Sequence, residues 1–138
     1  MYSFYLLFNG ERFEKSMANV KYASGWTRLI AETTDHDTAM KFVFAFGGRR
    51  FRIPLKATPK TLIARAIGLE AARKISAKFG DQRIDVSQER RNMSIWLRDQ
   101  GFSQEDIAHV LRISRKVVQQ YLAGDFDPQP MGIWGNKP

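Results

Sequence analysis

The sequence predicts a mainly helical α+β fold, in which two helix-helix-strand repeats form a small β-ribbon and a C-terminal three-helix helix-turn-helix follows. Two observations predict it. A stretch of the chain matches itself at an offset of 33 residues, and the residues after Ser87 fall into three capped helical segments. The length of 138 residues and the 43% hydrophobic content suit one compact domain or two very small ones, and exclude a wholly disordered polycation.

A β-hairpin is the first element that we expect. Residues 4–8 and residues 11–13 flank Asn9-Gly10, a pair that favours a tight turn between two strands. The hairpin and the repeats form an expected domain of residues 1–87, and the helix-turn-helix occupies residues 88–124. Residues 125–138 are rich in glycine and proline, which predicts an irregular tail.

The repeat aligns residues 29–54 with residues 62–87 without a gap, and eight of the 26 pairs are identical. Both copies fit one pattern of a short helix, a second helix, a Phe-Gly turn and a strand. In the second copy, Thr61 begins the short helix, and the second helix is expected over about residues 69–78. Gly80 is then expected to end that helix in a left-handed conformation.

Each strand of the repeat alternates apolar and charged residues, as half-buried strands do. Phe51 and Ile53 are expected to face inward in the first copy, as are Ile84 and Val86 in the second. A lone short strand leaves its backbone N–H and C=O groups unpaired, so each copy needs a neighbour. The other copy is the expected one.

After Ser87 the sequence predicts three helices joined by short turns, the spacing of a helix-turn-helix. Each helix has a serine as its expected cap: Ser87 for residues 88–100, Ser103 for residues 104–111, and Ser114 for residues 115–123. Arg112 occupies the turn position where such motifs usually have glycine. We therefore expect it to adopt a positive φ, at a cost on the order of 1 kcal/mol.

The third of these helices has a polar face that suits contacts with DNA bases. Arginine and lysine reach the two acceptors of guanine, glutamine pairs with adenine, and a serine at the helix N-terminus holds a phosphate. The residues that we expect to contact bases are Ser114, Arg115, Lys116, Gln119 and Gln120. A plain three-helix bundle with a polar face is the alternative.

The net charge of +8 comes entirely from residues 49–91, which contain 12 basic and 4 acidic residues. Such a charged segment attracts polyanions, of which nucleic-acid phosphate is the commonest in a cell. The residues that we expect to contact DNA phosphates are Arg49, Arg50, Arg52, Arg83, Arg90, Arg91 and Ser103. A solvated basic surface that aids solubility is the alternative.

Catalysis has no support in the sequence. With no cysteine, the chain has no disulfide, no thiolate nucleophile and no Cys-containing zinc site. The one cluster that resembles a metal or acid-base site, Asp35-His36-Asp37, precedes a helix expected over residues 38–46, where Asp37 suits the N-cap and Asp35 the helix dipole. No glycine-rich loop precedes a helix, and no nucleophile has an identifiable base. We expect no enzyme activity, no metal and no cofactor.

Several parts of the second half occur together in one known family. They are Gly68-Leu69-Glu70 through Phe79-Gly80-Asp81-Gln82-Arg83-Ile84-Asp85-Val86, then Arg90-Arg91, and then Ile107-Ala108, Leu111, Ile113-Ser114 and Val118. In these residues the chain, over about residues 62–123, resembles the Mor/C family of phage transcription activators. The resemblance implies an intertwined dimerisation module followed by a helix-turn-helix that binds DNA.

By this resemblance the dimerisation strand would contain Ile84 and Val86, and the repeat adds their equivalents Phe51 and Ile53 as a second such strand. The recognition helix would contain Arg115, Lys116, Gln119 and Gln120. Family members have one dimerisation module per chain, whereas this chain has two and a single helix-turn-helix. Two arrangements are therefore compatible with the sequence: an intramolecular pseudo-dimer, or a homodimer whose strands pair between chains.

The function that the sequence favours is a transcriptional regulator of phage or mobile-element origin that binds a specific sequence of double-stranded DNA. RNA polymerase or another host protein is a further expected partner, and activation and repression are equally compatible. The alternative is a phage-encoded interaction module that inhibits a host protein rather than binding DNA. No stretch approaches the roughly 20 apolar residues of a membrane span, so we expect a soluble, cytoplasmic protein with no membrane partner.

Overall fold

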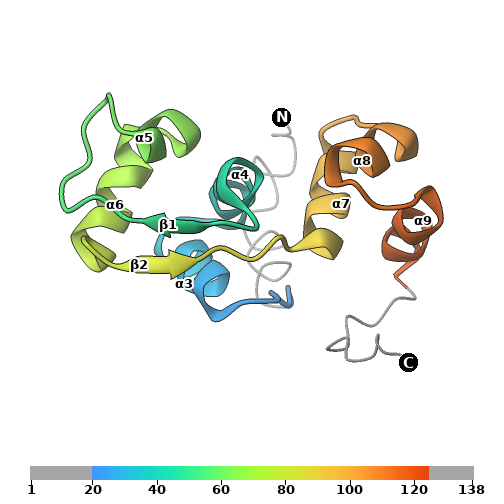
Figure 1. The fold of residues 1–138 in the computed structure, drawn as a ribbon, viewed down its shortest axis with the longest axis horizontal. Coiled ribbons are helices and arrows are strands. Elements are labelled where there is room, and N and C mark those ends of the chain that lie inside the picture. The colour runs from blue at the N-terminus through green and yellow to red at the C-terminus, as the bar shows by residue number, and fades with distance from the viewer. Residues whose placement is uncertain (1–19, 125–138) are drawn as a thin grey trace, which may run out of the picture.

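The computed structural model describes residues 20–124 of the chain (Figure 1). Its elements, in chain order, are α3 (Gly25–Thr33), α4 (His36–Phe46), β1 (Arg50–Arg52), α5 (Leu62–Ile67), α6 (Leu69–Phe79), β2 (Arg83–Asp85), α7 (Arg90–Asp99), α8 (Gln104–Leu111) and α9 (Arg115–Ala123). The predicted fold class, a mainly helical α+β fold with a two-stranded ribbon and three helices at the C-terminal end, is confirmed. The expected hairpin of residues 4–13 and the tail of residues 125–138 lie outside the described residues.

The two copies of the repeat fold alike and pair with each other. α4 and β1 recur as α6 and β2, and each boundary is displaced by the 33 residues of the sequence offset. The strands are antiparallel, and Phe51 lies opposite Ile84, its own equivalent in the repeat. An approximate two-fold axis therefore passes between these two residues.

Backbone hydrogen bonds obey the same symmetry. Gly48 N donates to Val86 O over 2.7 Å, and its equivalent, Asp81 N, donates to Ile53 O over 2.8 Å. Ile53 N donates to Gln82 O and Val86 N donates to Arg49 O, both over 2.9 Å. These bonds extend the pairing beyond β1 and β2, so the backbone requirement predicted for each short strand is met by the other copy.

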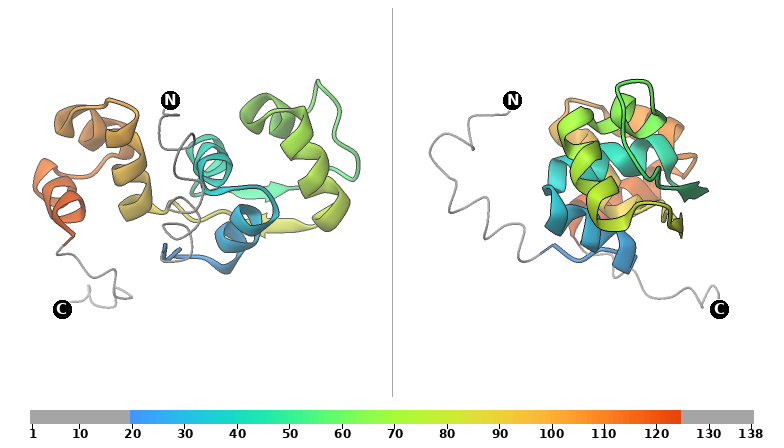
Figure 2. Two further views of the ribbon diagram at one scale, coloured as in Figure 1. Left: turned by 180° about the vertical axis from the view of Figure 1, so that it is seen from behind. Right: turned by 90° about the vertical axis from the view of Figure 1, so that its left-hand side faces the viewer.

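A single hydrophobic core joins the repeats to the C-terminal helices. Each copy packs its helices on the other, α4 against α5 and α3 against α6. The largest fully buried side chains include Phe42 and Ile53 from the first copy, Ile75 and Ile84 from the second, and Met93, Leu97, Ile107 and Val118 from the last three helices. Seen from behind, α3 and α4 lie between the α5–α6 end and the last three helices (Figure 2).

Two details of the repeat differ from expectation. Gly80 has φ of −54°, and the residue with left-handed conformation is Asp81, at φ of 69°. Glycine is nevertheless required at this position, because a Cβ at Gly80 would lie 2.6 Å from the carbonyl oxygen of Ser76. The cap of α4 is Asp35, whose carboxylate accepts from Thr38 N over 2.7 Å, while Asp37 lies in the first turn. The two aspartates thus exchange their predicted roles.

The start of α7 also differs from expectation. The helix begins at Arg90 with Glu89 as its N-cap residue, so the prediction that Ser87 caps a helix from residue 88 is wrong. The physical reason is that Val86 is still paired with the first copy, and the Ser87 hydroxyl donates to the Glu89 carboxylate over 2.6 Å. Among residues 20–124, no helix is both long and apolar enough to cross a membrane.

Candidate nucleic-acid interface

The last three helices form a helix-turn-helix whose boundaries are set by side-chain caps. Ser103 Oγ accepts from Asp106 N over 3.1 Å, and Ser114 Oγ accepts from Val117 N over 3.2 Å, as the sequence predicted. Arg112 ends α8 with φ of 58°, the positive value expected for a residue at the glycine position of the turn. Ile107 and Val118 are fully buried, which fixes α8 and α9 against each other.

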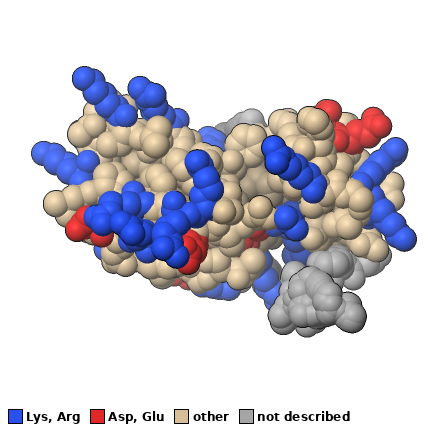
Figure 3. Space-filling model, viewed as in Figure 1, with Lys and Arg blue, Asp and Glu red and all other residues tan. Residues whose placement is uncertain are grey.

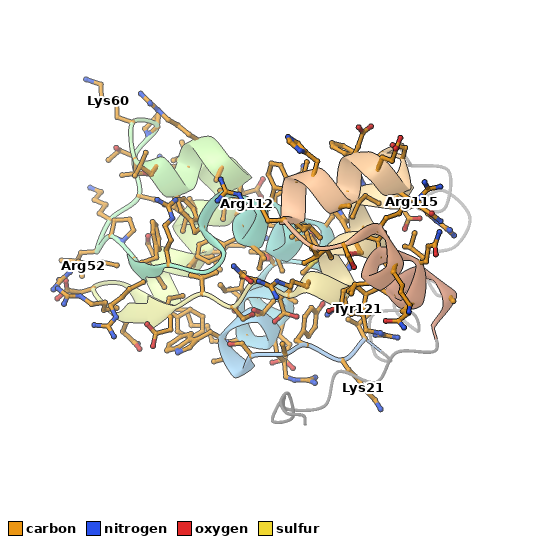
Figure 4. All side chains as sticks on the ribbon, turned by 45° about the vertical axis from the view of Figure 1, so that its right-hand side comes forward. Lys21, Arg52, Lys60, Arg112, Arg115 and Tyr121 are labelled. Atoms are coloured by element: carbon orange, nitrogen blue, oxygen red, sulfur yellow. The ribbon has the colours of Figure 1, made fainter. Side chains whose placement is uncertain are left out.

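The five residues expected to contact bases all lie exposed on the N-terminal part and outer face of α9. Ser114 has its hydroxyl engaged in the cap, and Arg115 projects from the outer side of the molecule (Figure 4). Gln119 Nε2 donates to Gln104 Oε1 of α8 over 3.2 Å, in a solvent-exposed hydrogen bond. The sequence between Arg112 and Gly124 contains no acidic residue.

The ribbon arginines expected to contact phosphates are partly neutralised. Arg50 pairs with Asp85 over 3.1 Å across the two strands, and Arg52 pairs with Asp81. Both pairs are solvent-exposed, so they are weak and readily exchanged for other partners. Arg49 donates to the carbonyl oxygen of Ala45 over 2.9 Å, and Arg83 is exposed and has no hydrogen-bond or ion-pair partner within residues 20–124.

The remaining expected phosphate contacts lie near the helix-turn-helix. Arg90 is exposed at the start of α7, whereas Arg91 is half-buried and its Nε atom has no hydrogen-bond partner in the described part of the chain. The Ser103 hydroxyl is the cap of α8. Arg52 and Arg115 lie at opposite ends of the molecule (Figure 4). The structure therefore separates the expected contacts into one group on the ribbon and another on the last three helices.

A groove of about 430 Å³ lies between α4 and the helix-turn-helix, and the sequence did not predict it. Its lining includes Phe44 of α4 and Val110 of α8, two apolar side chains that are 53% and 38% exposed. Arg90 and Arg112 are the charged residues among the described residues that line it. Phe44 lies off the inner face of its helix, and an apolar residue in that position is the signal that sequence reasoning could have used.

Glu89 joins the helix-turn-helix to the residues that begin α3, just before the first copy of the repeat, and sequence reasoning also missed it. Its side chain accepts from Ala23 N over 2.9 Å and from Ser24 N over 3.1 Å, at the start of α3. It also accepts from Ser87 Oγ and, over 3.1 Å, from Asn92 Nδ2. Glu89 is 3% exposed and has φ of 46°, so a strained backbone and a buried carboxylate coincide where α7 begins.

The side chains of the Asp35-His36-Asp37 cluster form contacts with other residues of the chain. His36 Nδ1 is 2.7 Å from the Tyr22 hydroxyl, and Asp37 accepts from Trp96 Nε1 over 2.8 Å. Burial lowers the pKa of His36, against the opposing effect of Asp37 and Asp35, which favours the neutral ring. Over residues 20–124, no group of three or more His, Asp or Glu side chains is placed to hold a metal ion.

The basic residues are unevenly distributed over the surface. In Figure 3, arginine and lysine side chains gather over the ribbon and the α5–α6 end, with the two ribbon aspartates among them. The last three helices have fewer charges, of both signs. No protein-family model, curated protein or solved structure matches the chain.

Proposed function

We propose that this chain is a transcriptional regulator of phage or mobile-element origin that binds a specific sequence of double-stranded DNA, with α9 as its recognition helix. One observation supports this above the others: α9 begins at a capped, exposed N-terminus and presents Arg115, Lys116, Gln119 and Gln120 to solvent. Its other face is fixed on α7 and α8 by Val118 and Tyr121. The resemblance to the Mor/C family supports the same proposal.

The chemistry of α9 suits the major groove. An arginine donates two hydrogen bonds to O6 and N7 of guanine, and a glutamine pairs with N6 and N7 of adenine. The N-terminus of the helix favours a phosphate oxygen through its unpaired N–H groups and its dipole. Ribbon arginines then add contacts with the backbone that depend on salt and not on sequence.

The pairing of the repeats affects how many chains are expected to bind one DNA site. In a homodimer, two helix-turn-helix units would contact half-sites about one helical turn apart. Here β1 and β2 pair within one chain, whose described residues 20–124 contain a single helix-turn-helix. We therefore propose that one chain occupies one half-site as an intramolecular pseudo-dimer.

Selection of bound duplexes from a random pool, followed by footprinting, tests the proposal. We expect a discrete preferred site, and Arg115→Ala or Gln119→Ala should each relax preference at one position by about 1–3 kcal/mol. Arg83→Ala should instead weaken binding to all sequences about equally. It should also lower the salt slope, the steepness with which log K for DNA binding falls against log salt concentration, by about 0.9. Arg98→Ala, at an exposed position in the last turn of α7, is the control. A pool that yields no preferred site would contradict the proposal.

The groove beside Phe44 favours a second candidate function, an interaction module that binds a host protein such as RNA polymerase. The exposed apolar side chains of Phe44 and Val110 and the two arginines of its lining suit an acidic segment with a bulky apolar side chain. The distinguishing measurement is binding to purified polymerase by a variant with Arg115, Lys116, Gln119 and Gln120 all changed to alanine. Undiminished binding by this variant, together with loss of binding in Phe44→Ala, would favour the second candidate.

A further inference from the structure

The approximate two-fold axis places different structures on its two sides. The axis relates β2 to β1, so the chain leaving β2 and the chain leaving β1 occupy equivalent places. After β2 comes the helix-turn-helix, whereas after β1 come residues 53–61 and then α5. In Figure 1 the helix-turn-helix and the α5–α6 pair accordingly lie at opposite ends of the molecule.

The helix faces that point toward these two ends differ in chemistry. α4 packs against α7, with Phe44 and Trp96 at a ring separation of 6.3 Å and with Met40 completely buried. The equivalents of Met40 and Phe44 in α6 are Arg73 and Ala77, and both are exposed. The face that packs on the helix-turn-helix in the first copy is thus cationic and open to solvent in the second, among the residues that the structure describes.

The two copies of the repeat also differ in their charge. Residues 29–46 contain one lysine and three carboxylates, whereas residues 62–79 contain four basic residues and one carboxylate. Three changes between equivalent residues account for most of this difference: Glu32 to Arg65, Met40 to Arg73, and Ala45 to Lys78. With Lys74, these cations form what we call the far-end surface: Arg65, Arg73, Lys74 and Lys78.

The far-end surface has the properties of a contact for a polyanion. All four side chains are exposed, and none forms an ion pair with another described residue. Lys78 Nζ lies 5.6 Å from the ring centre of Phe79, and the side chains of the other three form no hydrogen bond, ion pair or ring contact with another residue of 20–124. Unpaired arginines and lysines are the side chains that displace counterions from a DNA backbone.

We propose that the far-end surface binds the phosphate backbone of the same DNA and takes the place of a second helix-turn-helix. The inference rests on the proposed function, because it places a duplex with its own two-fold axis on that of the protein. Such a duplex passes α9 on one side and the α5–α6 end on the other. The expected site is therefore asymmetric: bases are recognised on one side of the axis, and only the backbone is held on the other.

The test uses the full chain with Arg65→Gln, Arg73→Gln and Lys78→Gln combined. A matched control removes the same charge elsewhere, through Lys21→Gln, Arg28→Gln and Arg98→Gln, all at exposed positions. Affinity is measured against salt for a selected duplex and for a duplex without the site, and hydroxyl-radical footprints are recorded on the selected one. Circular dichroism melting checks that both variants fold.

We expect the far-end variant to keep its preferred DNA sequence but to lose protection of the DNA backbone on one flank of the site. Its salt slope should fall by about 2.7 on both duplexes, roughly 0.9 for each lost phosphate contact. The control should change the slope by less than about 1. Equal slopes and footprints for the two variants would overturn the inference, as would a wild-type chain that binds neither duplex. A wild-type chain without a preferred site, combined with a far-end variant that still loses slope, would refute the proposed function and support the far-end contact.

Discussion

Phe51 and Ile84 face each other at the centre of the antiparallel ribbon, and they are equivalent residues of the repeat. A residue meets its own equivalent in this way only at a two-fold axis. Ile84 is 1% exposed, and Phe51 stacks on Phe46 with a ring separation of 4.2 Å. The axis between the two copies thus passes through the hydrophobic core, so pairing of the repeats and stability of the fold depend on the same side chains.

Ile84→Ala should lower the free energy of unfolding by about 2–5 kcal/mol, because it leaves a cavity where the two copies meet. Leu55→Ala is the matched control: this leucine is 75% exposed and lies just after the equivalent strand. Its loss should change stability by no more than about 0.5 kcal/mol. Urea unfolding of both variants is the measurement, and equal losses would contradict the assigned position of the core.

The symmetry also suggests a stabilising change. Ser76 is buried in α6, and its hydroxyl has no hydrogen-bond partner among residues 20–124. Its equivalent in α4 is Val43, which is buried without any polar atom to satisfy. Ser76→Ala should therefore raise the free energy of unfolding by about 1 kcal/mol, since the desolvation cost of the hydroxyl disappears. A loss of stability on urea unfolding would show that the hydroxyl has a partner after all.

Local patterns were sufficient to predict most elements. The inner faces of α6 and β2 follow from the spacing of Ile75, Phe79 and Ile84, and the caps Ser103 and Ser114 follow from serines placed before helical stretches. Asp35 and Asp37 could not be assigned in the same way, because either residue can cap α4. Trp96, 59 residues away, accounts for the contact of Asp37.

Long-range contacts account for what the sequence did not predict. Glu89 resembles an ordinary helix residue until Ala23 and Ser24, more than 60 residues earlier, come within hydrogen-bond distance of its carboxylate. The groove beside Phe44 exists only because α4 and α8 both lie next to α7, so that residues far apart in the sequence line one surface. For the expected DNA contacts, the sequence identified exposed residues of α9, but the separation of Arg52 from Arg115 depends on the whole fold.

Glu89→Ala should destabilise the chain by about 3 kcal/mol, because it leaves the N–H groups of Ala23 and Ser24 without their acceptor. Glu89→Gln should lose less, since one oxygen remains to accept. Glu32→Ala, at an exposed carboxylate in α3, should change stability by no more than about 0.5 kcal/mol. Thermal and urea unfolding measure all three, and a loss in Glu89→Ala no larger than in the control would refute the linking role.

Arg112→Gly should stabilise the chain by about 0.5–1 kcal/mol, because glycine adopts the observed φ of 58° without the steric cost that arginine bears. Part of the gain is offset by the greater freedom of glycine in the unfolded chain. Gln120→Gly, at an exposed position inside α9, is the control and should cost about 1 kcal/mol. A loss of stability in Arg112→Gly would mean that side-chain contacts of Arg112 outweigh its backbone strain.

The free energy of unfolding should fall as the pH is lowered from about 7.5 to 5.5, because His36 is half-buried and its surroundings favour the neutral ring. Burial raises the pKa of Tyr22 to about 12, so its hydroxyl stays protonated where it lies 2.7 Å from Nδ1 of His36. Burial lowers the pKa of His36 below the 6.5 of an unperturbed histidine, so the unfolded chain binds the proton more tightly than the folded chain does. The contribution of His36 to the free energy of unfolding is therefore complete above about pH 6.5 and is lost as the pH falls through the pKa of the folded chain.

His36→Gln, which cannot titrate, should flatten this pH dependence of the free energy of unfolding. The control His109→Gln, at an exposed position of α8, should keep it. Parallel pH profiles for the wild type and His36→Gln would show that other groups cause the loss of stability at low pH.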